Sequence, residues 1–257
     1  MRFLKGHGTE NDFVLLPDPD GRLLLTDAAV RRICDRRAGL GADGILRVVP
    51  TSLVPDAEGN AHWFMDYRNA DGSVAEMCGN GVRVYARYLV TAGLAQPGQL
   101  RLATRGGVRV VDVPPTGDIT VDMGLAVVGD PMDIDGMPAT FVDMGNPHAV
   151  VPVPSVAALG ELHPSRTDLN VEYVEDVGPA HIRMRVHERG VGETRSCGTG
   201  ACAAVVATAL RIGGLRGVPV AVDVPGGRLS VTWQQDGAVL LTGPAVLVAS
   251  GEWLGEI

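Results

Sequence analysis

The segment SCGTGACAAVVATALRI (residues 196–212) places a cysteine directly before a run of small and apolar residues that is typical of a buried helix. A second segment, MCGNGVRVYARYLVTA (residues 77–92), has the same order: cysteine, glycine, another residue, glycine and then a helical pattern. In both, a polar loop precedes the cysteine and a glycine follows the helix. The sequence therefore predicts two helices, each beginning at a Cys-Gly-x-Gly element.

The likeness between the two segments extends upstream, which indicates an internal repeat. Asn69 precedes Cys78 by nine residues, and Glu188 precedes Cys197 by nine. More loosely, GHGTENDFVLL and VDMGNPHAVV each place an asparagine after a glycine and before an apolar strand. The stretch VPPTGD (residues 113–118) has the composition of a linker, so we expect the boundary between the two halves there.

The rest of the chain indicates a mixed α+β (α/β) fold. A third helix should begin after the cap residue Thr26, bury Val30, Ile33 and Cys34, and end before Gly39. Short runs of alternating or β-rich residues predict strands, and most of these runs lie one turn apart, which favours antiparallel pairing. These runs are HWFMDY (62–67), DITVDM (118–123), HIRMRVHER (181–189), VAVDV (220–224) and RLSVTW (228–233).

Composition limits the function classes. A chain of 257 residues, 46% of them hydrophobic, can bury a sizeable core. Its net charge of −8 and lack of a basic run argue against a nucleic-acid or anionic-membrane partner and favour a small molecule. The apolar runs are too short to cross a bilayer, and the first residues lack the apolar core of a signal peptide, so we expect a cytoplasmic protein.

The cysteines and histidines do not form the spacing of a metal site, so we expect none. Without a secretory signal, the four cysteines are expected to be thiols. Cys34 and Cys202 fall on apolar helix positions and are expected to lie in the core.

The two other cysteines carry the predicted chemistry. A cysteine at a helix N-terminus lies at the positive end of the helix dipole, which should lower its thiol pKa from about 8.5 toward neutrality. Two such thiols, facing each other between the halves of the repeat, could invert a carbon centre: one removes a proton and the other delivers one to the opposite face. The backbone N–H groups of Gly79-Asn80 and Gly198-Thr199 could bind a carboxylate on that carbon and stabilise the developing negative charge.

This chemistry is predicted to need no cofactor. Abstraction of an amino-acid α-proton usually relies on pyridoxal phosphate, which requires a Schiff-base lysine. Lys5 is the only lysine, and no phosphate-binding loop surrounds it.

Four ordered motifs, GTENDF, YRNADGSVAEMCGNGVR, MGNPHAV and ERGVGETRSCGTGACA, closely resemble the diaminopimelate epimerase family, and the resemblance covers essentially the whole chain. It implies interconversion of LL- and meso-2,6-diaminopimelate in lysine and peptidoglycan synthesis, without a cofactor. It also implies a homodimer with two pseudo-symmetric domains, each a curled, mostly antiparallel sheet around a central helix. We assign residues 1–115 to one domain, with residues 250–257 returning to it, and residues 116–249 to the other.

The resemblance also implies roles for individual residues. Cys78 and Cys197 match the acid/base cysteines, and His148 and Glu188 match groups that assist them. Asn69, Asn170 and Arg189 match positions that grip the distal end of the substrate. Further substrate contacts are implied for Asn11, Gly79, Asn80, Asn146, Glu188, Gly198 and Thr199. Gly44 departs from the family pattern, because many members carry glutamine there; a backbone or water contact could replace that side chain.

Three alternatives stay open at this point. GTGACA (residues 198–203) fits a dinucleotide-binding fingerprint, although the chain lacks an alternating βαβ rhythm and a well-placed acidic residue. The paired cysteines could instead form a redox-sensing disulfide. Proline racemase-like enzymes use the same mechanism with two thiols, but the set of asparagine and arginine residues favours a substrate with a second amino-acid group.

Overall fold

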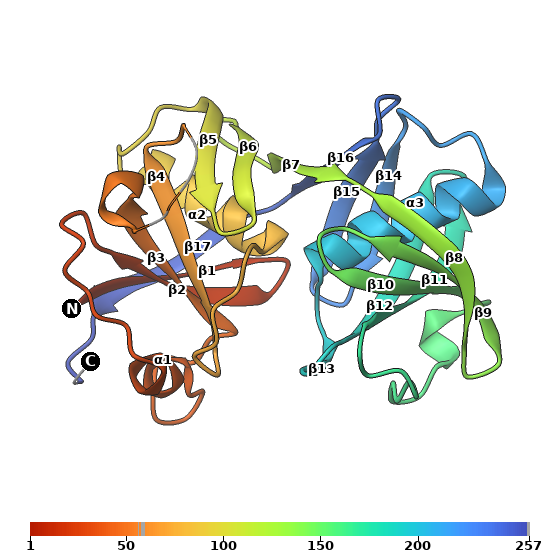
Figure 1. Ribbon diagram of the computed structural model, residues 1–257, viewed down its shortest axis with the longest axis horizontal. Coiled ribbons are helices and arrows are strands. Elements are labelled where there is room, and N and C mark those ends of the chain that lie inside the picture. The colour runs from red at the N-terminus through yellow and green to blue at the C-terminus, as the bar shows by residue number, and fades with distance from the viewer. Residues whose placement is uncertain (56, 58–59, 256–257) are drawn as a thin grey trace. The chain divides into compact units, whose positions relative to one another are not determined.

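Two sheet-based units make up the chain in a computed structural model, which describes residues 1–55, 57 and 60–255. The first unit comprises Met1–Val121 with Pro244–Ile257, and the second comprises Asp122–Gly243. In each, a mixed sheet packs around one long helix (Figure 1). The predicted fold class is confirmed. The sequence placed the limits between the domains at residues 115 and 249 instead, and these limits stay a prediction.

In the first unit, helix α2 contacts strands on several sides, including β1, β2, β6 and β17. Strand β2 pairs in parallel with β3, and β4 with β5, whereas β1–β2, β1–β17, β3–β4 and β5–β6 are antiparallel. The elements are β1 (Arg2–Gly8), β2 (Asn11–Pro17), α1 (Asp27–Cys34), β3 (Gly44–Pro50), η1 (Thr51–Leu53), β4 (Trp63–Asn69), α2 (Gly79–Thr91), β5 (Gly98–Thr104), β6 (Gly107–Val113) and β17 (Val246–Glu252). Strand β7 (Ile119–Leu125) spans the division between the units.

In the second unit, helix α3 contacts strands β9 to β12 and β14 to β16. Here β10 pairs in parallel with β11, and β12 with β14, whereas β8–β9, β9–β10, β11–β12, β14–β15 and β15–β16 are antiparallel. The elements are β8 (Val127–Ile134), β9 (Met137–Asp143), β10 (Pro147–Pro152), η2 (Val156–Ala158), β11 (Asn170–Gly178), β12 (His181–Glu188), β13 (Gly192–Thr194), α3 (Gly198–Ile212), β14 (Pro219–Val224), β15 (Gly227–Trp233) and β16 (Ala238–Gly243).

The repeat predicted from the sequence is present in the pairing of the strands. The parallel pair β2–β3 corresponds to β10–β11, and β4–α2–β5 corresponds to β12–α3–β14. Each long helix thus joins two strands that pair in parallel. The chain still lacks an alternating βαβ rhythm, because most of the other strand pairs in each unit are antiparallel.

Helix α3 forms the centre of the second unit because small side chains let strands approach it from many directions. Cys197 caps its N-terminus, Gly213 follows its last turn at φ 75°, and nearly all residues from Gly198 to Ala209 are buried. Cys202 is 0% exposed, so its prediction as a core residue is confirmed.

Helix α1 follows the predicted pattern at its start and ends earlier than expected. The Thr26 hydroxyl accepts a hydrogen bond from Ala29 N, and Cys34 is buried in an apolar cluster with Val30 and Ile33. The helix ends at Cys34, several residues before Gly39, where an added Cβ would collide with backbone carbonyls.

One buried cation fixes the start of helix α2. Arg83 is 0% exposed and donates hydrogen bonds to Gly79 O (3.3 Å), Asn80 Oδ1 (2.9 Å) and Pro244 O (3.3 Å). A buried arginine is stable only when such acceptors surround it. Arg83 therefore links the Cys-Gly element by hydrogen bonds to Pro244, where the C-terminal part of the chain re-enters this unit.

We predict that Arg83→Met lowers the free energy of unfolding by about 2–4 kcal/mol, because the methionine fills the space but leaves buried acceptors without a donor. Urea denaturation measures this change. Arg22→Met is the control: its side chain is 83% exposed, so we expect a change under about 0.5 kcal/mol. Equal stability of the two variants would contradict the structural role of Arg83.

Candidate active site

Cys78 caps helix α2 with its sulfur. Its backbone is extended (φ −144°), and Sγ accepts a hydrogen bond from Gly81 N at 3.4 Å. The thiol donates to Asn11 Oδ1 at 3.6 Å, and Asn80 Nδ2 donates to the same oxygen at 3.2 Å. The first unit thus brings together three residues that the sequence places at the site.

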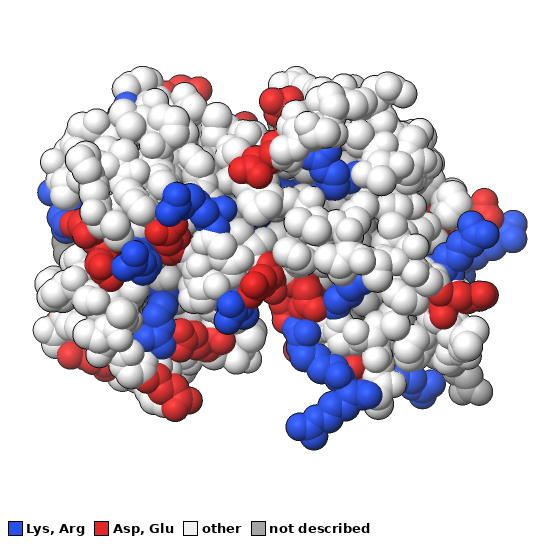
Figure 2. Space-filling model, turned by 180° about the vertical axis from the view of Figure 1, so that it is seen from behind, with Lys and Arg blue, Asp and Glu red and all other residues white. Residues whose placement is uncertain are grey.

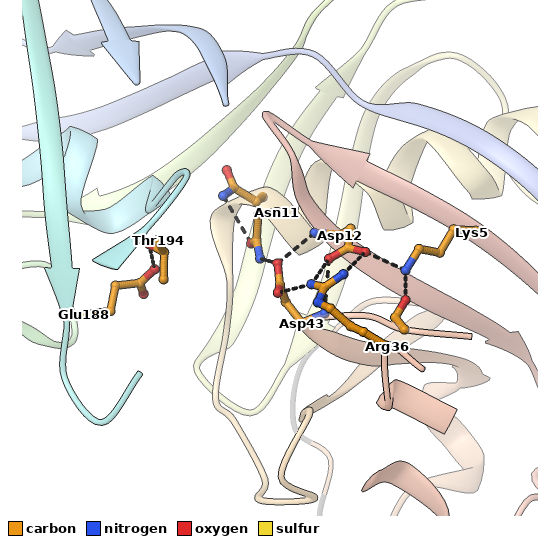
Figure 3. A network of polar contacts seen from close by, with 9 residues as sticks. Lys5, Asn11, Asp12, Arg36, Asp43, Glu188 and Thr194 are labelled. Carbon is orange, nitrogen blue, oxygen red and sulfur yellow. Dashed lines mark hydrogen bonds and ion pairs between the residues drawn. The ribbon is translucent and has the colours of Figure 1, made fainter. Parts of the chain in front are cut away.

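A charged network fixes the orientation of the Asn11 amide (Figure 3). Asn11 Nδ2 donates to Asp43 Oδ2 at 2.8 Å, and Arg36 bridges Asp43 (2.6 Å) and Asp12 (2.7 Å). Burial tends to raise the pKa of Asp12, but hydrogen bonds from Arg36 and Lys5 outweigh it and lower the pKa to about 2. Because Asp43 holds the amide nitrogen, Asn11 Oδ1 is directed to the thiol.

Lys5 belongs to the same network. Its ammonium lies 2.6 Å from Asp12 Oδ2 and donates to Gly41 O. The only lysine of the chain is therefore engaged in a partly buried ion pair.

Asn69 ends strand β4 and lies opposite Gly44 in the register of β3 and β4. Its side-chain nitrogen donates to Ser73 Oγ at 2.9 Å. An added Cβ at Gly44 would lie 2.5 Å from Arg68 O and 2.7 Å from Tyr67 Cε2. The Arg68 carbonyl and the Tyr67 ring therefore leave no room for a side chain at position 44.

Cys197 caps helix α3 in the same manner as Cys78 caps α2. Its Sγ accepts a hydrogen bond from Gly200 N at 3.4 Å and lies 3.4 Å from Thr199 Oγ1. The residue is 6% exposed, and Gly198 is buried as the first residue of the helix.

The pKa of Cys197 differs from the expectation based on the helix dipole. Burial raises the pKa of this thiol well above its usual range, and the carboxylates of Glu188 and Glu172 raise it further. Hydrogen bonds from Thr199 and Gly200 oppose the increase without offsetting it. The prediction of a lowered pKa was wrong for Cys197, because burial and two nearby carboxylates outweigh the helix terminus.

Glu188 ends strand β12 and accepts a hydrogen bond from the Thr194 hydroxyl (Figure 3). Burial raises the pKa of Glu188, while hydrogen bonds to Thr194 and Cys197 act in the opposite direction. The structure therefore places this predicted assisting group beside the Cys197 thiol.

Of the other predicted residues of the second unit, His148 lies on β10 and Asn170 on the neighbouring strand β11, whereas Asn146 directly precedes β10 and Arg189 directly follows β12. His148 is 0% exposed, with Nε2 3.1 Å from Asn146 Oδ1. Asn170 donates to Pro147 O at 3.0 Å and accepts from Arg189 N at 3.0 Å. These contacts link four of the predicted substrate or assisting residues through two adjacent strands and one loop.

Glu172 was missed in the sequence analysis. It is 0% exposed, and its Oε1 lies 2.7 Å from His148 Nδ1. The signal was available: a glutamate stands in the otherwise apolar strand pattern NVEYV, on the same face as Asn170.

Among the described residues, no group of three or more histidine, cysteine, aspartate or glutamate side chains could hold a metal ion. No helix in the part of the chain that the structure describes is long and apolar enough to cross a membrane.

Comparison with solved structures defines the fold class. A structure titled a predicted epimerase, from Pseudomonas aeruginosa, superposes with a TM-score of 0.77 at 18% identity, over 99% of each chain. The chain thus has the same fold as this structure, and in this chain a cysteine caps the central helix of each unit.

The sequence comparisons identify the family. The model of the diaminopimelate epimerase family matches residues 3–128 and 140–248. A diaminopimelate epimerase from Streptomyces coelicolor is 56% identical, over 98% of this chain and 95% of the relative. One from Thermobifida fusca is 49% identical, over 98% of this chain and 97% of the relative. The chain belongs to the diaminopimelate epimerase family.

We predict that Cys197 stays a neutral thiol in the ligand-free protein at neutral pH. Since its pKa is raised, the rate of alkylation by iodoacetamide should keep rising about tenfold per pH unit to beyond pH 9. Mass spectrometry of the labelled peptide measures this rate. In urea the same peptide should level off near the ordinary thiol pKa; a plateau below pH 8 in the folded protein would contradict the prediction.

Proposed function

We propose that this chain interconverts LL- and meso-2,6-diaminopimelate without a cofactor, in lysine and peptidoglycan biosynthesis. The observation that supports this most directly is the matched pair of cysteine-capped helices in a chain of the diaminopimelate epimerase family. Each sulfur is held at a helix N-terminus by an N–H of the first turn.

In the proposed mechanism, both thiols act on one α-carbon from opposite faces. A thiolate at one cysteine takes the α-proton, and the electron pair of the broken C–H bond delocalises into the α-carboxylate. The thiol of the other cysteine then gives its proton to the opposite face. Because the reaction runs in both directions, the two cysteines exchange roles: the base in one direction is the proton donor in the other.

The helix starts are proposed to bind the α-carboxylate. The first N–H groups of a helix have no intrahelical acceptor, so those at Gly79-Asn80 and Gly198-Thr199 are suited to an anion. Negative charge grows on this carboxylate as the α-proton leaves, so the same donors stabilise the transition state more than the bound substrate.

The remaining residues are proposed to orient the substrate and assist the thiols. Asn69, Asn170 and Arg189 would grip the distal amino-acid head, which does not react. His148 and Glu188 would assist proton transfer, and Asn11 and Asn146 would contact the reacting head. In support, Asn11 accepts a hydrogen bond from Cys78, and Asn146 lies beside His148.

We further propose a cytoplasmic homodimer without a nucleic-acid or membrane partner. The resemblance to the family supports the dimer. The net charge of −8 supports the absence of polyanionic partners, and acidic and basic side chains are interspersed on the face drawn in Figure 2.

We predict that solvent deuterium enters the α-position of meso-diaminopimelate, and that LL product forms, when the reduced protein is incubated in D₂O without added cofactor. Cys78→Ala and Cys197→Ala should each lower kcat by at least about a hundredfold, because each removes one acid/base group. Proton NMR follows both signals. Cys202→Ala is the control, since this buried thiol lies inside α3 and caps nothing. Near-normal turnover in either capping variant would eliminate the two-thiol mechanism.

We predict that Arg189→Ala lowers kcat/KM for diaminopimelate by about tenfold or more through weaker binding of the distal head. Steady-state kinetics tests this. Arg211→Ala is the control, because Arg211 lies in the last turn of α3 and pairs with Asp176. An unchanged specificity constant would remove Arg189 from the substrate site.

A further inference from the structure

A buried pair of ionisable side chains lies behind the Cys197 turn. His148 and Glu172 are both 0% exposed, and Nδ1 of the imidazole is 2.7 Å from Oε1 of the carboxylate. They stand on the parallel strands β10 and β11. On β11 the neighbouring residues Val171 and Tyr173 belong to an apolar cluster with Ala149 and Val151. Because side chains alternate along a strand, Glu172 is on the opposite face, toward α3.

Glu172 is packed directly against the first turn of helix α3. A Cβ added to Gly200 would lie 2.6 Å from Glu172 Oε1 and 3.3 Å from the Cys197 Cβ. Gly200 is also the residue whose N–H donates to Cys197 Sγ. The absence of a side chain at position 200 therefore allows one buried carboxylate to reach the turn that holds the thiol.

The Glu172 carboxylate is incompletely hydrogen-bonded. Its Oε2 is buried without a hydrogen-bond partner among the described residues. Burial of a carboxylate in this state is unfavourable unless the remaining interactions compensate, and a buried ion pair is often no more stable than apolar side chains of similar size. Packing alone does not explain a glutamate at this position.

In the first unit, the two positions equivalent to His148 and Glu172 carry apolar side chains, Phe13 and Leu46. Phe13 follows Asn11 by two residues, as His148 follows Asn146, and Leu46 follows Gly44 by two residues, as Glu172 follows Asn170. The registers agree, since Phe13 lies opposite Gly44 and His148 opposite Asn170.

Leu46 and Phe13 contact the Cys78 turn as Glu172 contacts the Cys197 turn. A Cβ added to Gly81 would lie 3.3 Å from Leu46 Cδ2 and 3.5 Å from Phe13 Cζ. The fold thus accepts an apolar pair behind a capping cysteine. Behind Cys197 alone, this pair is replaced by a histidine and a glutamate.

We propose that Glu172 is a positioning residue of the reaction: its carboxylate accepts a hydrogen bond from His148 Nδ1, fixes a proton on that nitrogen and sets the orientation of the ring. This inference rests on the proposed function, in which His148 assists proton transfer. With Nδ1 bound to Glu172, the other ring nitrogen, Nε2, lies 3.1 Å from Oδ1 of Asn146, an amide that can turn its nitrogen to donate to an unprotonated Nε2. Glu172 thereby determines which nitrogen of His148 is presented to the site.

The test is ¹⁵N NMR of histidine-labelled protein, with His148 assigned from the His148→Phe variant. In the unmodified chain we expect Nδ1 to carry a proton. Glu172→Gln can still accept from Nδ1 and should preserve this state, whereas Glu172→Leu has no acceptor and should shift the proton to Nε2. The kcat should fall by about 100-fold in Glu172→Leu and by less than about tenfold in Glu172→Gln, with KM nearly unchanged.

Two further variants separate positioning from packing. The double variant His148→Phe/Glu172→Leu copies the Phe13 and Leu46 pair, so it should melt no lower than the unmodified chain and yet lose turnover. Tyr173→Phe, on the other face of β11, should leave both the tautomer and kcat unchanged.

A protonated Nδ1 in Glu172→Leu, or full kcat in that variant, would overturn the proposal. The NMR measurement needs no substrate, so it remains decisive even if the protein fails to epimerise diaminopimelate.

Discussion

The hydrogen bond between a cysteine sulfur and the N–H three residues later is the interaction on which the rest of each unit depends. It makes Cys78 and Cys197 the caps of α2 and α3, so each sulfur has a fixed position relative to the first turn of a central helix. The strands pack around these helices, and Asn11 at the start of β2 and Glu188 at the end of β12 lie beside the two thiols. A serine or aspartate would cap a helix more strongly, but neither has a thiol to take and return a proton near neutral pH.

The repeat supplies two similar helix starts with different surroundings. Cys78 contacts an asparagine that a partly buried network of Asp12, Arg36 and Asp43 orients, and apolar side chains pack behind its turn. Cys197 is more deeply buried and lies near two carboxylates, which raise its thiol pKa. The two helix starts are therefore alike in their capping geometry and different in the burial and charge around the sulfur.

The fold and much of the site followed from short-range patterns in the sequence. The capping element, the apolar run of α3, the glycines after α2 and α3 and the alternating strands were predicted correctly, since each depends on residues within a few positions of one another. The parallel pairs β4–β5 and β12–β14 were missed, because the strands in each pair are separated by a helix and loops. Register between distant strands cannot be read from local periodicity.

The sequence by itself therefore determined the two cysteine-capped helices, the repeat and the family. The tertiary structure alone decided the pairing of His148 with Glu172, the orientation of Asn11 by Asp43, the lack of room for a side chain at Gly44 and the raised pKa of Cys197. The physical reason is that capping and periodicity arise within one segment of chain. Burial and electrostatic interactions instead depend on which distant segments meet, and at the Cys197 turn they outweigh the local effect of the helix terminus.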